Sequence, residues 1–285
     1  MISGTRYQLS AEIARQTQLA QQIARAQSDI STTTRIQAPS DDPAAAARIA
    51  VIGRSQANEA VWSTNVEMAA AIASRGDTTL GTVTNAINRA LELMTSASTA
   101  TLNDSDRQAI AVELRGIAQD ITAASNEKDS NGNPLFPTGA SPRIPVGNNL
   151  FVSPTASRAE IFEGIDTPSG PMDMASIINA AADAVVLTDP TARAAATGDA
   201  LTAVNAASTR ITAAAGDQGV RGKQIDAARD RLTASTQALA EERTTLESTD
   251  ITATVAKLQS MLLSLQAAQT TFARINQASL FDLLS

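Results

Sequence analysis

The chain has 285 residues, of which 43% are hydrophobic but only 2% aromatic, and its formal net charge is −7. It contains no Cys and no His. This excludes disulfides, thiol nucleophiles, zinc sites built on those residues and the usual general base near neutral pH. The acidic balance argues against a nucleic-acid partner and an anionic membrane, because both need a basic surface. Small aliphatic residues with few aromatics favour slender helices packed side by side.

The sequence shows neither a membrane-spanning segment nor a cleavable export signal. No run of about 18 apolar residues is present, so we expect no transmembrane helix. Residues 1–20 lack a basic start followed by an apolar stretch, so we expect no cleavable signal peptide. The protein therefore either stays inside the cell or leaves it by a route that reads no cleaved signal.

The N-terminal region has a heptad pattern, with positions alternating in steps of four and three. The seam consists of Leu9, Ile13, Gln16, Ala20, Ile23, Gln27 and Ile30. After a short polar segment, Asp42 as N-cap and Pro43 as first helical residue predict the start of a second helix.

The second helix carries the same four-three spacing, at Trp62, Val66, Ala69, Ala73, Gly76, Leu80, Val83, Ile87, Ala90 and Met94. Gly76 is its weak point, with a cost of about 1 kcal/mol relative to Ala. We expect this helix to end near residues 99–103. Ser105 with Gln108 then predicts a capping box for a third helix, whose apolar face is Ile110, Leu114, Ile117, Ile121 and Ala124.

Residues 129–172 differ in character, since they hold seven of the ten prolines and three of the five phenylalanines. Alternating apolar residues on both sides of Gly147-Asn148-Asn149 predict a hairpin. The segment 129–133 resembles a calcium loop only briefly, because Pro134 and Ala140 stand where that loop needs Gly and Glu. We therefore predict a turn within a small, β-containing insertion.

Helical signals return at Asp173, and Asp189-Pro190 is another cap-and-start pair. A heptad repeat then runs through Val204, Ile211, Gln218, Ile225, Leu232, Leu239 and Leu246. The repeat continues through glycines at 216, 219 and 222, so we predict one long helix that is softened there. The heptad register is interrupted at residues 248–250, which predicts a break in the helix there. A last heptad pattern follows, at Ile251, Val255, Leu258, Leu262, Leu265, Gln269 and Phe272.

These patterns predict a mainly α fold, a long antiparallel helical rod whose N- and C-terminal helices pair as a coiled coil, with the small β-containing insertion at its tip. Three domains are expected: 1–44 with 249–285 as a terminal helical domain, 45–128 with 173–248 as a helical rod, and 129–172 as the insertion. The heptads of residues 45–247 are equally compatible with the core of a monomeric bundle. The terminal seams carry glutamines, which are poorly suited to a finished core, and are expected to gain order in an assembly.

No pattern indicates catalysis, a cofactor or a metal site. Adjacent Asp41 and Asp42 are better explained by capping than by acid-base chemistry. The glycines at 216, 219 and 222 follow no strand and do not match a dinucleotide fingerprint. No serine lies in a motif that would activate it. We therefore expect a protein that is not an enzyme.

Residues 30–46 resemble the N-terminal signature of the flagellin superfamily, in which I-S-[ST]-G-x-R-[IL] leads into P-S-D-D-P-[AV]-A-A-A. Thr33 or Thr34 stands where that family usually has Gly. Residues 246–252, 265–275 and 279–284 are similar to its C-terminal elements. Pro39 and the Phe281-Asp282 ending are more similar to the hook-filament junction members of the family than to filament flagellin. About 75 residues carry these motifs.

The resemblance implies a structural protein of the bacterial flagellum, an adaptor that joins hook and filament and has no catalytic activity. It implies export through the flagellar type III apparatus without a cleaved signal, and a final location outside the cell. The implied partners are copies of the chain, the other hook-filament junction protein, flagellin and an export chaperone, with no nucleic acid and no membrane.

Assembly is expected to bury apolar residues of the terminal helices. The predicted interface consists of Leu9, Ile13, Ile23, Ile30, Ile251, Val255, Leu258, Leu262, Leu265, Phe272, Ile275, Leu280 and Phe281. Filament flagellin is the alternative function. A cytoplasmic signalling coiled coil is a more distant one, which the Pro-rich insertion does not fit.

Overall fold

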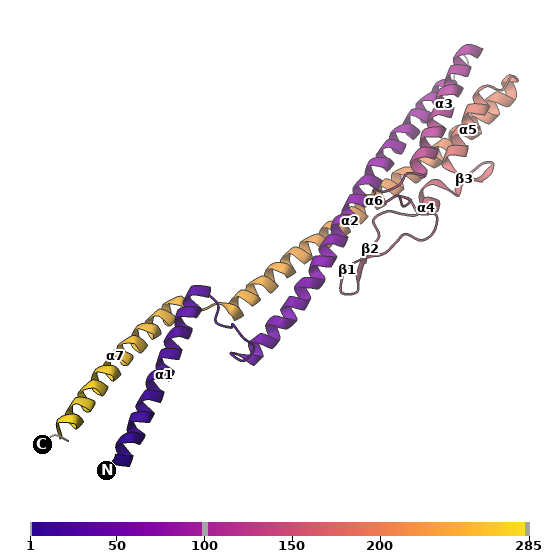
Figure 1. Cartoon of the computed structure of the whole chain (residues 1–285). Helices are drawn as coiled ribbons and strands as arrows, with labels where there is room; N and C mark the ends of the chain where they lie inside the picture. The colour runs from indigo at the N-terminus through magenta and orange to yellow at the C-terminus, as the bar shows by residue number, and fades with distance from the viewer. Residues whose placement is uncertain (1, 99–101, 283–285) are drawn as a thin grey trace. The chain divides into compact units, whose positions relative to one another are not determined.

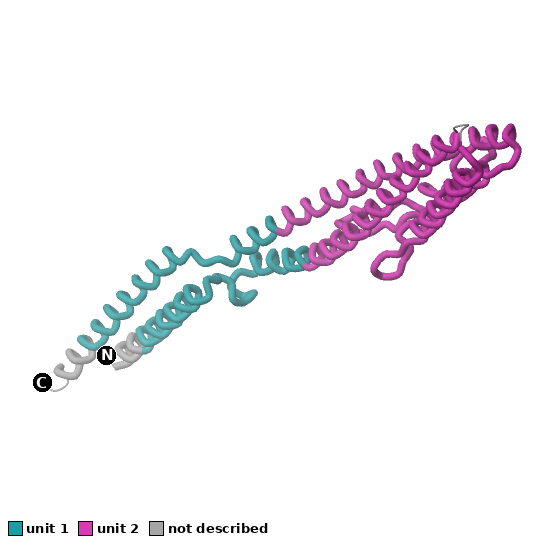
Figure 2. The backbone as a smooth tube through the Cα atoms, turned by 90° about the horizontal axis from the view of Figure 1, so that it is seen from above, with its two compact units in different colours: residues 1–56, 237–285 teal, residues 57–236 magenta. Residues whose placement is uncertain are grey.

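The computed structural model describes residues 2–98 and 102–282, and the surroundings of the side chains over 10–98 and 102–274. The described chain is mainly α-helical with two small antiparallel strand pairs, which confirms the predicted fold class (Figure 1). It divides into two compact units (Figure 2). Unit 1 comprises residues 1–56 and 237–285, and unit 2 comprises residues 57–236. The three domain boundaries expected from the sequence stay a prediction.

The elements follow one another as α1 (Ile2–Thr32), α2 (Pro43–Ala97), α3 (Asp104–Ser125), β1 (Ile144–Gly147), β2 (Leu150–Val152), α4 (Arg158–Phe162), β3 (Ile165–Thr167), β4 (Gly170–Met172), α5 (Met174–Val185), α6 (Pro190–Glu247) and α7 (Ile251–Asp282). The single long helix through the three glycines and the break at residues 248–250 are both confirmed. None of the described helices is long and apolar enough to cross a membrane.

Two predicted helix starts are confirmed by their caps. Asp42 Oδ1 accepts a hydrogen bond from Ala45 N at 3.0 Å at the start of α2. Asp189 Oδ2 accepts one from Ala192 N at 3.0 Å at the start of α6. In both cases Pro occupies the first helical position, where its missing N–H has no helical partner to lose.

The predicted cap of α3 is wrong. Asn103 is the N-cap, with extended backbone angles and a side-chain oxygen that accepts from Asp106 N at 2.8 Å. The helix therefore begins at Asp104, and Ser105 lies inside its first turn. Asparagine competes with serine as an N-cap residue, and here it stands earlier in the chain.

The core of unit 2 lies among α2, α3, α5 and α6. The predicted ladders are buried from Val66 to Met94 on α2 and from Val204 to Ile225 on α6, whereas Trp62 and Leu232 at their outer ends are half-buried. Val204 and Ile211 are fully buried. Phe136 and Phe162, from the segment between α3 and α5, meet edge to face with ring centroids 5.4 Å apart. Helices of small residues thus pack closely, and aromatic residues fill the place where the insertion meets them.

Gln218, the single polar residue of the α6 repeat, is 3% exposed and satisfied within the fold. Its Nε2 donates to Ala73 O at 3.0 Å on α2 and to Pro154 O at 2.8 Å in the insertion. The polar interruption of the heptad therefore links two helices and the insertion, because a buried amide needs such partners.

Gly76 lies beside this amide. A Cβ added at Gly76 would come within 2.8 Å of Thr155 Cγ2. Thr155 is 1% exposed, and its hydroxyl donates to Leu135 O at 2.7 Å. The glycine that weakens α2 in the sequence is thus required for the close approach of the insertion.

The predicted hairpin is present as β1 and β2, which pair antiparallel with Ile144 opposite Val152. Both side chains are buried together with Val66 of α2 and Ile225 of α6. The segment at Asp129 is a turn, as predicted, in which Oδ1 of that residue accepts from two backbone N–H groups. The second hairpin, β3 with β4, and the short helix α4 were not predicted.

Candidate functional site

Helices α1 and α7 lie side by side in unit 1 and run antiparallel, because Thr33, directly after α1, is hydrogen-bonded to Thr249, shortly before α7. Among the residues with described side chains, their contact buries Ile23, Ala26 and Met261, each 7–8% exposed. Three partly buried leucines complete it, namely Leu19, Leu258 and Leu265. Over the part of the two helices whose side chains are described, the shared core is thus very small.

The contact between α1 and α7 differs from the predicted seam at every second position. Ile23, Leu258 and Leu265 take part, as expected. Elsewhere the contact moves by one residue, so Leu19 replaces Ala20, Ala26 replaces Gln27 and Met261 replaces Leu262. Ile13 and Leu262 are therefore outside this contact and are 52% and 45% exposed.

The shift has a physical reason in the glutamines. The predicted seam would bury Gln27 and Gln269, and a buried amide without partners is costly. In the structure both are exposed, while Ala26 is buried and Ala268 is half-buried.

Several of the predicted interface residues face outward. On α7, Ile251 and Leu262 are each 45% exposed, and the adjacent Leu263 is 70% exposed. Ile30, Val255 and Phe272 are half-buried. Leu9, Ile275, Leu280 and Phe281 belong to α1 and α7 but lie outside the residues whose side chains are described.

The segment between α1 and α2 meets the break between α6 and α7. Arg35 N donates to Glu247 O at 2.7 Å, and Thr249 N donates to Thr33 O at 3.0 Å. These two bonds make a short antiparallel bridge within unit 1. We call residues 25–42 together with 246–250 the joint, because four helix ends converge there.

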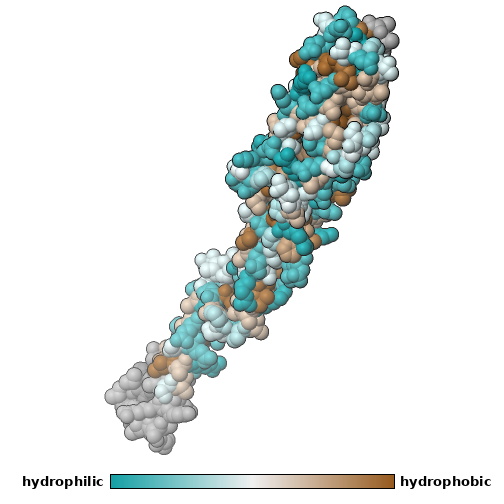
Figure 3. All heavy atoms as spheres, turned by 90° about the vertical axis from the view of Figure 1, so that its right-hand side faces the viewer, coloured by the Kyte–Doolittle hydropathy of each residue, from teal (hydrophilic) through white to brown (hydrophobic). Residues whose placement is uncertain are grey.

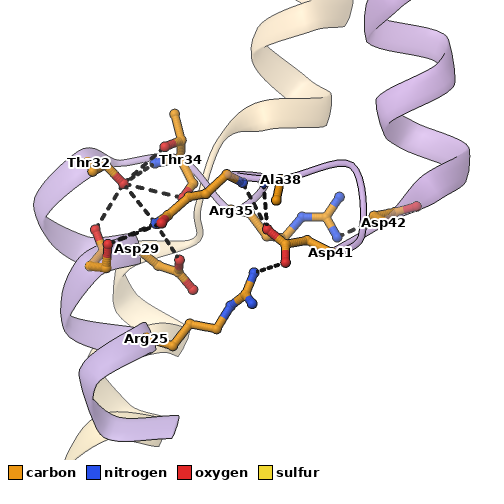
Figure 4. A network of polar contacts seen from close by, with 10 residues as sticks. Arg25, Asp29, Thr32, Thr34, Arg35, Ala38, Asp41 and Asp42 are labelled. Carbon is orange, nitrogen blue, oxygen red and sulfur yellow. Dashed lines mark hydrogen bonds and ion pairs between the residues drawn. The ribbon is translucent and has the colours of Figure 1, made fainter. Parts of the chain in front are cut away.

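Asp41 is the centre of the polar contacts in the joint (Figure 4). Its Oδ2 accepts from Gln37 N at 3.0 Å and Ala38 N at 2.9 Å, and its Oδ1 is paired with the Arg25 guanidinium at 2.6 Å. The Arg25 hydrogen bond and the two backbone bonds lower the pKa of Asp41 to about 2. Asp41 thus fixes the loop and the last turns of α1 to each other.

A second set of contacts ties the same loop to the helix ends. Gln37 Nε2 donates to Asp29 Oδ1 at 3.0 Å. The Arg35 guanidinium reaches Asp42 Oδ2 at 3.4 Å and donates to Leu246 O at 3.3 Å, at the C-terminal end of α6. A cation at that end interacts favourably with the helix dipole.

Sequence reasoning found only part of this joint. The capping role of Asp42 is confirmed, whereas Asp41 was also interpreted as a capping residue and instead binds Arg25. Nothing in local spacing pairs Arg25 with a carboxylate 16 positions later.

Within the described residues no group of three or more acidic side chains could hold a metal ion. The face shown in Figure 3 is mostly hydrophilic, with hydrophobic residues in separate patches.

Comparison with protein families gives two matches. The model for the bacterial flagellin N-terminal helical region matches residues 5–139, and that for the bacterial flagellin C-terminal helical region matches residues 201–284. Together they cover most of the chain and leave out residues 140–200, which comprise most of the insertion, α5 and the start of α6.

Two curated relatives are flagellar hook-associated protein 3 of Salmonella typhimurium and of Escherichia coli. They are 35% and 34% identical to this chain over 107 residues. In each case the match covers 38% of this chain, and the chain spans about a third (34%) of the relative's length.

Solved structures of related proteins share the fold. Flagellar hook associated protein-3 from Legionella pneumophila has a TM-score of 0.64 at 14% identity, over 70% of this chain and 98% of that chain. A putative flagellar hook-associated protein from Vibrio parahaemolyticus has a TM-score of 0.64 at 18% identity, over 72% and 99%. FlgL of Xanthomonas campestris gives 0.60 at 17%, over 68% and 99%. With family matches on both sides of the insertion, the chain belongs to the bacterial flagellin family.

Proposed function

We propose that the chain is a structural subunit of the bacterial flagellum that joins the hook to the filament. The observation that carries an assembly role is the imbalance in unit 1. Over the described side chains, residues 10–32 of α1 and 251–274 of α7, the two helices share three buried side chains, while apolar residues of α7 face outward. Long helices need a partner face, because propensity alone contributes little to their stability.

The junction role, rather than that of filament flagellin, is supported by the relatives. Both curated relatives carry the name flagellar hook-associated protein 3. The ending with Phe281-Asp282 is a second point of likeness to junction members. The named relatives are components of the flagellum, which supports a structural rather than a catalytic role.

In this mechanism the terminal helices have two faces. One face, with Ile23 and Met261, holds α1 against α7 within a copy. The other, with Ile13, Ile251 and Leu262, packs against neighbouring copies. Full burial of one such side chain contributes about 1.5–3 kcal/mol. Several neighbours must contribute together to exceed the entropy lost on association, so assembly is cooperative.

The remaining partners follow from the same proposal. Unit 1 contacts further copies, the other hook-filament junction protein and flagellin, and the C-terminal region binds an export chaperone before assembly. The chain leaves the cell through the flagellar type III apparatus without a cleaved signal. In the proposed domain division, residues 1–44 with 249–285 assemble, 45–128 with 173–248 form the helical rod, and 129–172 lie outermost.

A deletion strain tests the junction role. Cells that lack the chain are expected to build hooks without attached filaments and to release flagellin into the medium, because filament subunits have no adaptor. Expression of the chain from a plasmid restores the filaments. Normal filaments in the deletion strain would contradict the proposal, and loss of flagellin itself from the medium would indicate that the chain is the filament subunit.

A further inference from the structure

The residue after α1 has a strained backbone. Thr33 has φ = +57°, in the left-handed region. The branched side chain of threonine fits that region poorly, whereas Gly and Asn adopt it readily. The other described non-glycine residue with positive φ is Asn149, in the hairpin turn, where the residue type suits the conformation.

Surrounding contacts hold Thr33 in place. Its carbonyl accepts from Thr249 N at 3.0 Å, and the next peptide group is fixed by the bond from Arg35 N to Glu247 O at 2.7 Å. A strained residue persists only when its neighbours determine its conformation. Here those neighbours are the end of α6 and the break between α6 and α7.

The rest of the attachment of α1 is weak. Its contact with α7 buries only Ile23 and Ala26 of its described residues. The Arg25 side chain, which pairs with Asp41, is 51% exposed, so water competes for this ion pair. The strain at Thr33 therefore opposes a small set of favourable contacts.

We propose that the joint is a strained hinge, in which Thr33 keeps α1 easy to detach from α7 in the unassembled chain. The strain is released when α1 changes direction as the subunit enters an assembly. The hinge itself follows from the geometry of the joint, and its use in assembly rests on the proposed function.

Hydrogen exchange tests the hinge in the purified full-length chain. Thr33→Asn relieves the strain, so the amides of residues 15–32 are expected to exchange about fivefold more slowly. Thr34→Asn is the matched control, because positive φ occurs at Thr33 and not at Thr34, and it is expected to leave exchange unchanged or faster. Thr33→Gly keeps the test valid if asparagine perturbs the loop, and it also slows exchange. Exchange as fast as in the natural chain for both Thr33 variants would overturn the hinge.

Assembly is measured separately. In a deletion strain that expresses Thr33→Asn, the fraction of hooks carrying filaments is expected to fall by about half, because the stabilised joint opens less often. Slower exchange with an unchanged fraction would overturn the use of the hinge in assembly. If the chain is not a junction protein, the deletion strain itself shows this, either by normal filaments or, for a filament subunit, by the loss of flagellin from the medium. The exchange result still decides whether the hinge exists.

Discussion

Unit 1 and unit 2 have very different cores. The main cluster of unit 2 contains thirty buried apolar residues from α2, α3, α5, α6 and the insertion. The cluster of unit 1 contains three among the side chains that are described. Unit 2 therefore has the core of a self-sufficient domain, whereas the described side chains of unit 1 form a much smaller cluster.

The two units also differ in net charge. Unit 1 holds nine basic and nine acidic residues, so the net charge of −7 belongs entirely to unit 2. Like charges repel at short range, and a neutral surface brings copies together without this penalty. This difference is consistent with the proposed function, in which unit 2 folds by itself and unit 1 is completed by neighbouring copies.

The largest effect is expected from Leu114→Ala, which removes a fully buried side chain from unit 2. The free energy of unfolding should fall by about 2–5 kcal/mol, through lost burial and a new cavity. Leu263→Ala is the control in unit 1, where the side chain is 70% exposed, and should change it by less than about 0.5 kcal/mol. Urea denaturation measures both. Equal losses in the free energy of unfolding for the two variants would contradict the described difference between the cores of unit 1 and unit 2.

Gly76→Ala is expected to destabilise unit 2 by about 1–3 kcal/mol, because the new methyl group overlaps Thr155 Cγ2. Gly81→Ala on the same helix is the control, since nothing lies within 4 Å of its Cβ position, and it should stabilise the helix by up to about 1 kcal/mol. Adding Thr155→Ser to Gly76→Ala removes the overlapping atom. Thermal unfolding should then show recovery, and no recovery would mean that the close contact is not the cause.

Adjacent residues of α7 separate the two faces of unit 1. Met261→Asp places a charge in the contact with α1, so the amides of α1 should lose protection from exchange. Leu262→Asp changes an exposed position and should leave the free chain as it is while preventing incorporation into flagella. Hydrogen exchange and immunoblots of purified flagella check the pair. Normal incorporation of Leu262→Asp would remove that residue from the proposed interface.

The smallest effect concerns the pH dependence of the joint. The pKa of Asp41 is lowered from 3.8 to about 2 by Arg25 and two backbone N–H groups. Its contribution to the joint is therefore fully present above pH 3.8 and is lost as the pH falls through about 2. Carboxyl chemical shifts followed by NMR should report this titration, and Asp41→Asn should remove it. An ordinary pKa at this position would contradict the contacts described for the joint.

The sequence predicts unit 2 better than unit 1. Ladders such as Val204, Ile211 and Ile225 identify buried faces, because a closed core demands apolar residues at a regular period. In unit 1 the contact between α1 and α7 differs from the predicted seam at alternate positions, since two faces of α7 carry apolar residues and only one contacts α1. The joint was largely missed, because the pairing of Arg25 with Asp41 depends on tertiary contacts that no local pattern encodes. The positive φ of Thr33 had one signal, the Gly that the resembled family usually has at position 33 or 34.

Gold-labelled antibody against residues 129–172, applied to intact flagella and viewed by electron microscopy, tests the junction role most directly. The proposed function predicts a single narrow band of label where hook meets filament. Label along the whole filament would identify the chain as a filament subunit. Flagella without any label would contradict the proposal that the chain is part of the flagellum.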